Sequence, residues 1–130
     1  MTPEQIRIVR EIVDQVRGSE AFAVGFYRRL FAAVPETRGM FSDLDAQRVK
    51  LTGELDALVD LISDLPALQA RAADLGERHR GYGVRASHYR QARAAMVESL
   101  AEVLGPDFGP AEVEAWDRAT SLITELMQAT

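Results

Sequence analysis

The 130 residues, 47% hydrophobic and 27% charged, are typical of one compact soluble domain, and we expect residues 1–130 to enclose a single small-molecule site. The absence of cysteine excludes disulfides and thiolate metal ligands, and the net charge of −5 argues against a nucleic-acid partner. No apolar run is long enough to span a membrane and the N-terminus lacks signal-peptide features, so we expect a cytoplasmic protein.

The first third of the chain predicts two helices and a short turn of helix. The first begins at a capping box formed by Thr2 and Gln5, carries an apolar stripe and ends at Gly18. A second helix begins near Ser19, and its inward face consists of Phe22, Phe26, Tyr27, Leu30 and Phe31. Pro35 then opens a short helical turn that leaves Phe41 in a corner.

The next helix carries one polar residue on an apolar stripe. Ser42 or Asp43 can cap its start. The stripe is formed by Leu51, Leu55, Leu58 and Ile62, at steps of four and three residues. One turn before Leu51 the same face reaches Gln47.

The helix that begins at Pro66 is expected to carry a histidine into the interior. Its apolar stripe is formed by Leu68, Ala72 and Leu75. The next position on this stripe is His79, and Gly81 stands where a helix commonly ends in a left-handed residue. An inward imidazole can be a core residue, a general base or a metal ligand, and this stretch alone favours the core residue.

Two more helices complete the predicted fold. Ser87 can cap the first of them, and Gly105-Pro106 ends it. Its inward residues are Tyr89, Ala92, Met96 and Leu100. Pro110 starts the last helix, whose inward residues are Val113, Trp116, Ile123 and Met127. We therefore predict an all-α fold of six main helices and one short helix.

Three polar side chains are predicted to point inward from different helices. Each of them has an ordinary explanation. The side chains of Tyr27 and His79 can each bond a backbone carbonyl, and Gln47 can lie at the edge of its helix in water. Buried polar atoms need partners, however, so several aimed inward together suggest a lined cavity.

A series of residues along the whole chain resembles the bacterial globins. The resemblance is strongest to the single-domain haemoglobins and to the haem domains of flavohaemoglobins. It is carried, in order, by Phe-Tyr-Arg-Arg-Leu-Phe at 26–31, Pro35, Phe41, Gln47, Lys50-Leu51, Leu65-Pro66-Ala67, Arg78-His79, Gly83-Val84 and His88-Tyr89.

The resemblance implies a haem b cofactor (iron protoporphyrin IX) with His79 as its proximal iron ligand. Tyr27 and Gln47 would face bound O₂, NO or CO on the distal side. The other implied cofactor contacts are Phe41, Leu51, Leu75, Val84 and Tyr89 around the porphyrin, with Lys50 and Arg78 as charge partners of its propionates. His88 precedes the inward Tyr89, so we expect it to point away from the cavity as a corner residue.

The same resemblance contains one departure. In flavohaemoglobins a glutamate late in the last helix bonds the proximal histidine, together with the tyrosine that matches Tyr89. The matching glutamate position falls just beyond Thr130, so we expect weaker electron donation from His79. Flavin and nicotinamide domains are also missing from these residues, so a redox cycle would require an external reductase.

Three functions follow as hypotheses. The first is a haem globin, monomer or homodimer, that reversibly binds O₂ for storage, transport or sensing. The second is an NO dioxygenase that works with a separate reductase. The third is a globin-like signalling module without haem, against which His79 and Phe41 argue.

Overall fold

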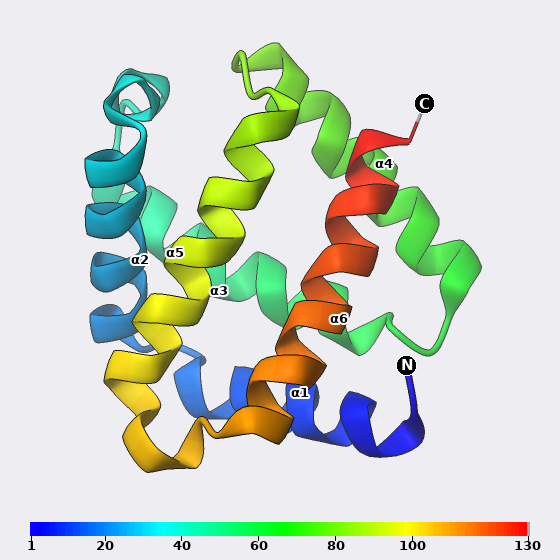
Figure 1. Cartoon of the computed structure of the whole chain (residues 1–130). Helices are drawn as coiled ribbons and strands as arrows, with labels where there is room; N and C mark the ends of the chain where they lie inside the picture. Colours follow the sequence, from blue (N-terminus) through cyan, green and yellow to red (C-terminus); the bar gives the residue numbers. More distant parts are fainter. Residues whose placement is uncertain (130) are drawn as a thin grey trace.

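The computed structural model describes residues 1–129 as α-helices joined by short connections (Figure 1). The α-helices are α1 (Pro3–Val16), α2 (Glu20–Ala33), α3 (Leu44–Asp60), α4 (Leu65–Gly81), α5 (Ala86–Leu104) and α6 (Pro110–Gln128), and the 3₁₀ helices are η1 (Pro35–Met40) and η2 (Gly105–Asp107). Within residues 1–129 no strand forms, which confirms the all-α prediction. The six main helices and the short one after Pro35 lie where expected, and η2 is an additional short turn.

Most helices begin at the residues whose side chains can satisfy free backbone N–H groups. At α1 the N–H of Gln5 donates to Thr2 Oγ1 at 3.0 Å, and the N–H of Thr2 donates to the Gln5 amide oxygen, also at 3.0 Å. At α2 and α3 a single bond caps the helix, with Ser19 accepting from the N–H of Phe22 and Asp43 from the N–H of Ala46. The capping pattern in the sequence therefore predicted these starts correctly.

Helix α4 ends at Gly81 as predicted, but two details of the connection between α4 and α5 were predicted wrongly. Gly81 stays helical, because the N–H of Tyr82 still reaches the carbonyls of the last turn, and Gly83 takes the positive φ of +90°. Ser87 does not cap α5. The residue before that helix is Arg85, whose N–H donates to His88 Nδ1 at 3.0 Å, so an imidazole takes the place expected for the serine hydroxyl.

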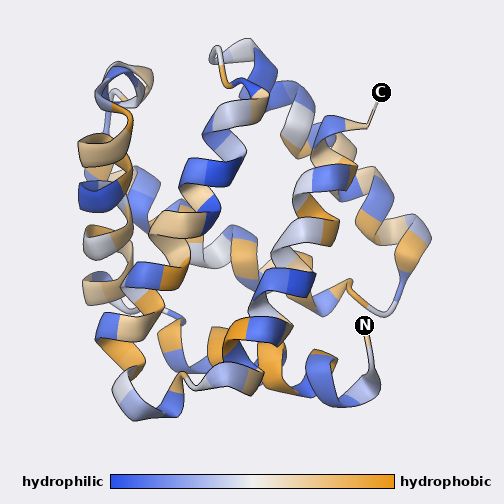
Figure 2. Ribbon diagram, viewed as in Figure 1, coloured by the Kyte–Doolittle hydropathy of each residue, from blue (hydrophilic) through white to orange (hydrophobic). Residues whose placement is uncertain are grey.

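The helices pack in pairs around a core that extends through the fold. In Figure 1 α1 lies along the base, and the main contacts join α2 to α5, α4 to α6, and α1 to both α3 and α6. Apolar and polar residues alternate along each helix in Figure 2, as expected of helices with one buried face. Val113 was predicted to face inward but is 36% exposed, because it lies at the edge of the contact between α5 and α6.

The crossing of α4 over α6 brings two backbones together. Gly76 is buried there, and a Cβ atom at this position would overlap the carbonyl group of Met127. The Arg80 guanidinium donates to the same carbonyl oxygen at 3.2 Å. A glycine is therefore required for the close approach that seats α4 on the end of α6.

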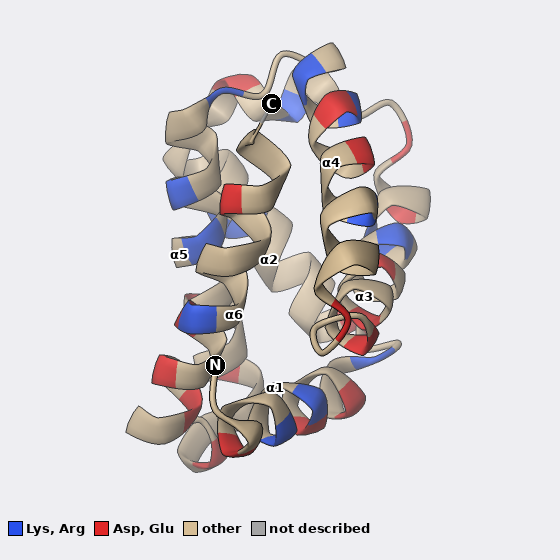
Figure 3. Ribbon diagram, turned by 90° about the vertical axis from the view of Figure 1, so that its right-hand side faces the viewer, with Lys and Arg blue, Asp and Glu red and all other residues tan. Residues whose placement is uncertain are grey.

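Acidic and basic residues are interspersed along the helices (Figure 3). Arg10 pairs with Asp56 and Asp60 and so links α1 to α3, and Arg29 pairs with Glu102 and links α2 to α5. Among residues 1–129, no helix combines the length and the apolar character needed to cross a bilayer.

Candidate functional site

A cavity of about 700 Å³ lies among the helices and contains every residue that the sequence nominated for the site. Those ten lining residues are Tyr27, Phe41, Gln47, Lys50, Leu51, Leu75, Arg78, His79, Val84 and Tyr89. They come from α2, α3, α4, α5 and the connections beside them. The volume is within the range of about 300 to 1,000 Å³ that is usual for small-molecule and cofactor sites.

His79 is half-buried in the wall of this cavity, on the last turn of α4. Its Nδ1 lies 2.8 Å from the Leu75 carbonyl oxygen, which can only accept, so Nδ1 carries the hydrogen. Burial lowers the pKa of His79, and the bond to Leu75 opposes this only in part. The ring is therefore neutral near pH 7, and Nε2, which bonds no described residue, keeps a free lone pair.

The surroundings of His79 hold its ring in one orientation. The Tyr89 ring stacks beside it, with 6.2 Å between ring centroids and 20° between planes. The N–H of Val84 donates to the His79 carbonyl at 3.1 Å, which ties the chain after α4 to the same turn. Burial raises the pKa of Tyr89, so that phenol stays protonated. These contacts restrict both the side chain and the backbone of the histidine.

Tyr27 presents a neutral hydroxyl donor from α2. It is only 3% exposed, and burial raises its pKa to about 12, while the neighbouring Gln47 amide offsets part of that rise. Phe41 packs edge-on against the Tyr27 ring, at 5.3 Å between centroids. Figure 1 shows α2 and α4 on opposite sides of the fold, so this donor and His79 enter the cavity from different walls.

Two cations lie at the rim of the cavity. Lys50 is exposed and pairs with no carboxylate within residues 1–129. Arg78 makes long ion pairs with Asp74 at 3.5 Å and Glu54 at 3.9 Å, and Glu54 also holds Arg71 at 2.6 Å. Both cations are therefore available to an anionic group that enters the cavity.

His88 corrects one expectation from the sequence. It was predicted to point away from the cavity, but it is 5% exposed and belongs to the cavity wall. Its Nδ1 accepts from the Arg85 N–H, and its Nε2 donates to the Glu36 carboxylate at 3.1 Å. Both ring nitrogens are thus used to join η1 to the start of α5, which is the corner role that the sequence suggested.

The cavity also includes two polar α6 residues that the sequence did not nominate, Thr120 and Thr124. Their hydroxyls donate to backbone carbonyls one turn back, Thr120 to Trp116 at 2.9 Å and Thr124 to Thr120 at 2.8 Å. The available signal was their spacing, because they follow the inward Trp116 at steps of four. With their hydroxyls satisfied on α6 itself, they present mainly methyl groups to the cavity.

Comparison with known proteins agrees with this arrangement. A flavohemoprotein of Rhodopirellula baltica is 28% identical over 132 residues, which cover 97% of this chain and 32% of the relative. A flavohemoprotein of Bacillus cereus is also 28% identical over 132 residues, covering 96% of this chain and 32% of the relative. The chain therefore spans about a third of the length of these relatives.

A solved structure is similar over nearly the whole chain. It is an engineered carbene transferase made from a candidate nitric oxide dioxygenase of Rhodothermus marinus. The two are 30% identical with a TM-score of 0.85, over 98% of this chain and 90% of that one. The family model described as Globin matches residues 24–127. Since that match extends over most of the chain, this protein belongs to the globin family.

Proposed function

We propose that this chain binds haem b in the cavity, with His79 as the axial ligand, and binds O₂ reversibly for storage, transport or sensing. The observation that carries the proposal is the state of His79: its Nδ1–H is bonded to Leu75, and its Nε2 is free in a cavity of about 700 Å³. A neutral imidazole with one nitrogen anchored is the form in which histidine ligates metals.

The remaining lining residues fit a large apolar cofactor with an anionic edge. Leu51, Leu75 and Val84 would pack against the ring and exclude water, and Lys50 and Arg78 would pair with the propionates. When bound, haem would supply an iron that takes O₂, NO or CO as an exchangeable ligand. Tyr27 and Gln47 would donate hydrogen bonds to that ligand without adding a charge.

A second candidate function is NO dioxygenation, and a specific similarity favours it. The solved structure at 30% identity is described as a candidate nitric oxide dioxygenase. The reaction combines NO with O₂ and one electron to give nitrate, and a separate reductase would supply the electron. Tyr27 and Gln47 suit either function. Nitrate formed per haem over repeated turnovers, measured with a reductase and NADH, separates catalysis from simple binding, because bound O₂ that reacts only once gives one nitrate per haem.

The visible spectrum of the purified protein tests the haem proposal directly. Haem reconstitution is expected to give distinct ferric and ferrous spectra, and CO is expected to shift the ferrous bands. The same experiment decides between the haem globin and the third hypothesis, a signalling module without haem. A protein that takes up no haem at equimolar concentration would contradict the proposal.

Truncation of Phe41 to alanine is expected to speed haem loss by roughly tenfold. The side chain lines the cavity, and removing a large aromatic group from a packed site costs about 3 to 5 kcal/mol, of which only part falls on the cofactor because Phe41 is half-buried. Haem transfer to an apo-globin acceptor gives the rate.

Phe31→Ala is the matched control for this experiment. Phe31 contacts both Tyr27 and Phe41, with centroids at 5.7 and 5.8 Å, but does not line the cavity. The Phe31→Ala substitution therefore removes a ring of the same size from the same aromatic cluster without removing a cofactor contact. Equal rates of haem loss from the two variants would exclude Phe41 from the haem site.

A further inference from the structure

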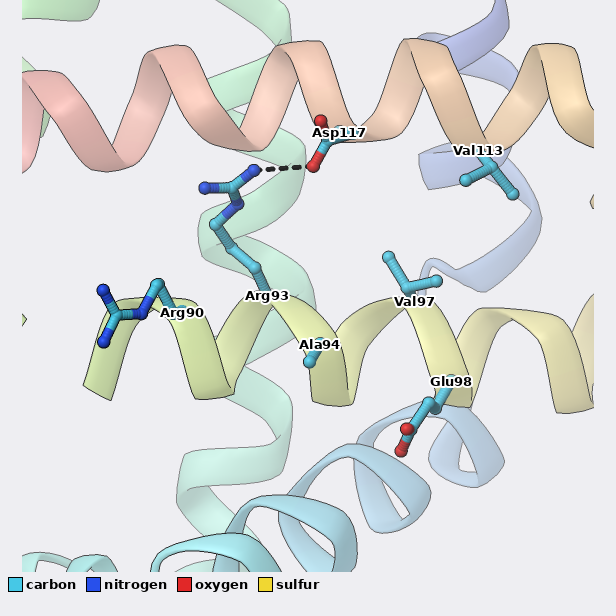
Figure 4. A pocket seen from close by; sticks show the side chains of 7 residues that line it. All are labelled: Arg90, Arg93, Ala94, Val97, Glu98, Val113 and Asp117. Atoms are coloured by element: carbon cyan, nitrogen blue, oxygen red, sulfur yellow. Dashed lines mark hydrogen bonds and ion pairs between the residues drawn. The ribbon is translucent and has the colours of Figure 1, made fainter. Parts of the chain in front are cut away.

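A second hollow lies outside the cavity, on the exposed side of α5 and α6 (Figure 4). Its volume is about 530 Å³, and its lining residues are Arg90, Arg93, Ala94, Val97 and Glu98 of α5 with Val113 and Asp117 of α6. Val97 and Val113 face each other across it and make its centre apolar. A second protein that covered this hollow would bury the two valines and meet the charged residues around them.

The charges along α5 have opposite signs at the two ends of this groove. Arg90 and Glu98 each lie four residues from Ala94, about 6 Å along the helix in opposite directions and on the same face. No ion pair formed within residues 1–129 includes Arg90. The Glu98 side chain is 66% exposed, and its contact with Arg29 is long, 3.7 Å, because Arg29 mainly holds Glu102. Both charges can therefore pair with a second molecule.

The remaining charged pair in the groove is already satisfied within the chain. Arg93 donates to Asp117 Oδ1 at 2.6 Å and so joins α5 to α6, as Figure 4 shows. This pair links the two walls of the groove. The charges left for recognition are Arg90 and Glu98.

We propose that this face joins two copies of the chain as a symmetric dimer, with α5 antiparallel to α5 of the second copy and Ala94 at the twofold axis. The rotation places Arg90 opposite the partner subunit's Glu98, and Glu98 opposite the partner subunit's Arg90. The small side chain of Ala94 permits close approach at the axis, and the partner's helix covers Val97 and Val113.

The order of the charges is the reason for choosing a second copy over an unrelated protein. A twofold interface requires one patch to be complementary to itself, so that each residue meets the residue on the opposite side of the axis. A positive end and a negative end at equal distances from a small central residue meet this requirement. The proposal does not depend on haem, since none of these side chains lines the haem cavity.

Sedimentation velocity of the purified chain tests the proposal through charge reversal. The wild type is expected to dimerise. Arg90→Glu and Glu98→Arg are each expected to weaken the dimer at least about tenfold, because symmetry turns one substitution into two like-charge contacts. The double variant Arg90→Glu/Glu98→Arg restores both pairs with reversed polarity, so its dissociation constant is expected to return to within about threefold of wild type.

Glu77→Arg is the matched control, because it changes the net charge by the same amount as Glu98→Arg on the exposed surface of α4. It is expected to leave the dimer unchanged. Circular dichroism of each variant checks that the helices are retained. The proposal is overturned if the wild type stays monomeric up to roughly 1 mM, if the control weakens the dimer equally, or if the double variant is no tighter than the single ones.

Discussion

Replacing His79 with alanine is expected to leave a folded protein that no longer retains haem with its native spectrum. His79 contributes the only imidazole nitrogen in the cavity wall that has no hydrogen-bond partner among the described residues. Loss of the iron ligand would leave the cofactor held by apolar contacts and rim charges alone. The measurement is the ferrous spectrum after reconstitution, before and after addition of imidazole, which should occupy the vacated space.

His88→Gln is the control for this substitution. His88 also lines the cavity, but both of its ring nitrogens are engaged, one by Arg85 and one by Glu36. Its replacement is therefore expected to preserve the haem spectrum and to lower the thermal stability instead. A native ferrous spectrum in His79→Ala, unchanged by imidazole, would show that another residue holds the iron.

Replacing Tyr27 with phenylalanine is expected to accelerate O₂ dissociation by roughly ten to a hundredfold. The substitution keeps the buried ring and removes one hydroxyl, whose pKa of about 12 makes it a neutral donor across the physiological range. A hydrogen bond to a partly charged acceptor contributes about 1.5 to 3 kcal/mol, and each 1.4 kcal/mol corresponds to a tenfold change. O₂ gains negative charge on binding to ferrous haem and CO gains little, so CO release should change much less.

Tyr82→Phe is the control for the hydroxyl deletion. Tyr82 stands at the rim of the cavity but is 66% exposed, so water can replace any hydrogen bond that it makes. Stopped-flow release of O₂ and CO from the wild type and both variants gives the comparison. An O₂ rate for Tyr27→Phe within about twofold of wild type would mean that Tyr27 only packs and that Gln47 or water holds the ligand.

The helix starts were predictable from the sequence because each depends on a few neighbouring residues. Thr2 with Gln5, Ser19 and Asp43 satisfy N–H groups within the same first turn, and no distant contact is needed. The residue that takes the left-handed conformation after α4 was less predictable, because Gly81 and Gly83 can both adopt it. The choice depends on whether the N–H of Tyr82 completes the last turn, as it does.

Three polar site residues drew attention because polar side chains that point inward are few, and the resemblance to the bacterial globins implied their roles and the other seven residues of the site. Tyr27, Gln47 and His79 stood out in this way, and the structure places them in one cavity. The sequence did not predict that His88 faces the cavity, because the orientation of its ring depends on a hydrogen bond to Glu36, which is far away in the sequence. The exposure of Val113 was missed for a related reason: helical spacing gives the direction of a side chain and not how far the neighbouring helix extends.

The small side chains on the buried face of α4 have a consequence for how haem would leave the protein. Of the three residues that this face buries fully, Leu68, Ala72 and Gly76, only Leu68 has a large side chain, and Leu75 packs against the core while remaining partly exposed. Local opening of α4 should therefore require less free energy than global unfolding, and its backbone amides should exchange with solvent before those of α1 or α6. Because His79 lies on the last turn of α4, such an opening would withdraw the iron ligand while the rest of the fold stays intact. The lifetime of a haem complex would then depend on the closed fraction of one helix, and bound haem would in turn slow amide exchange along that helix.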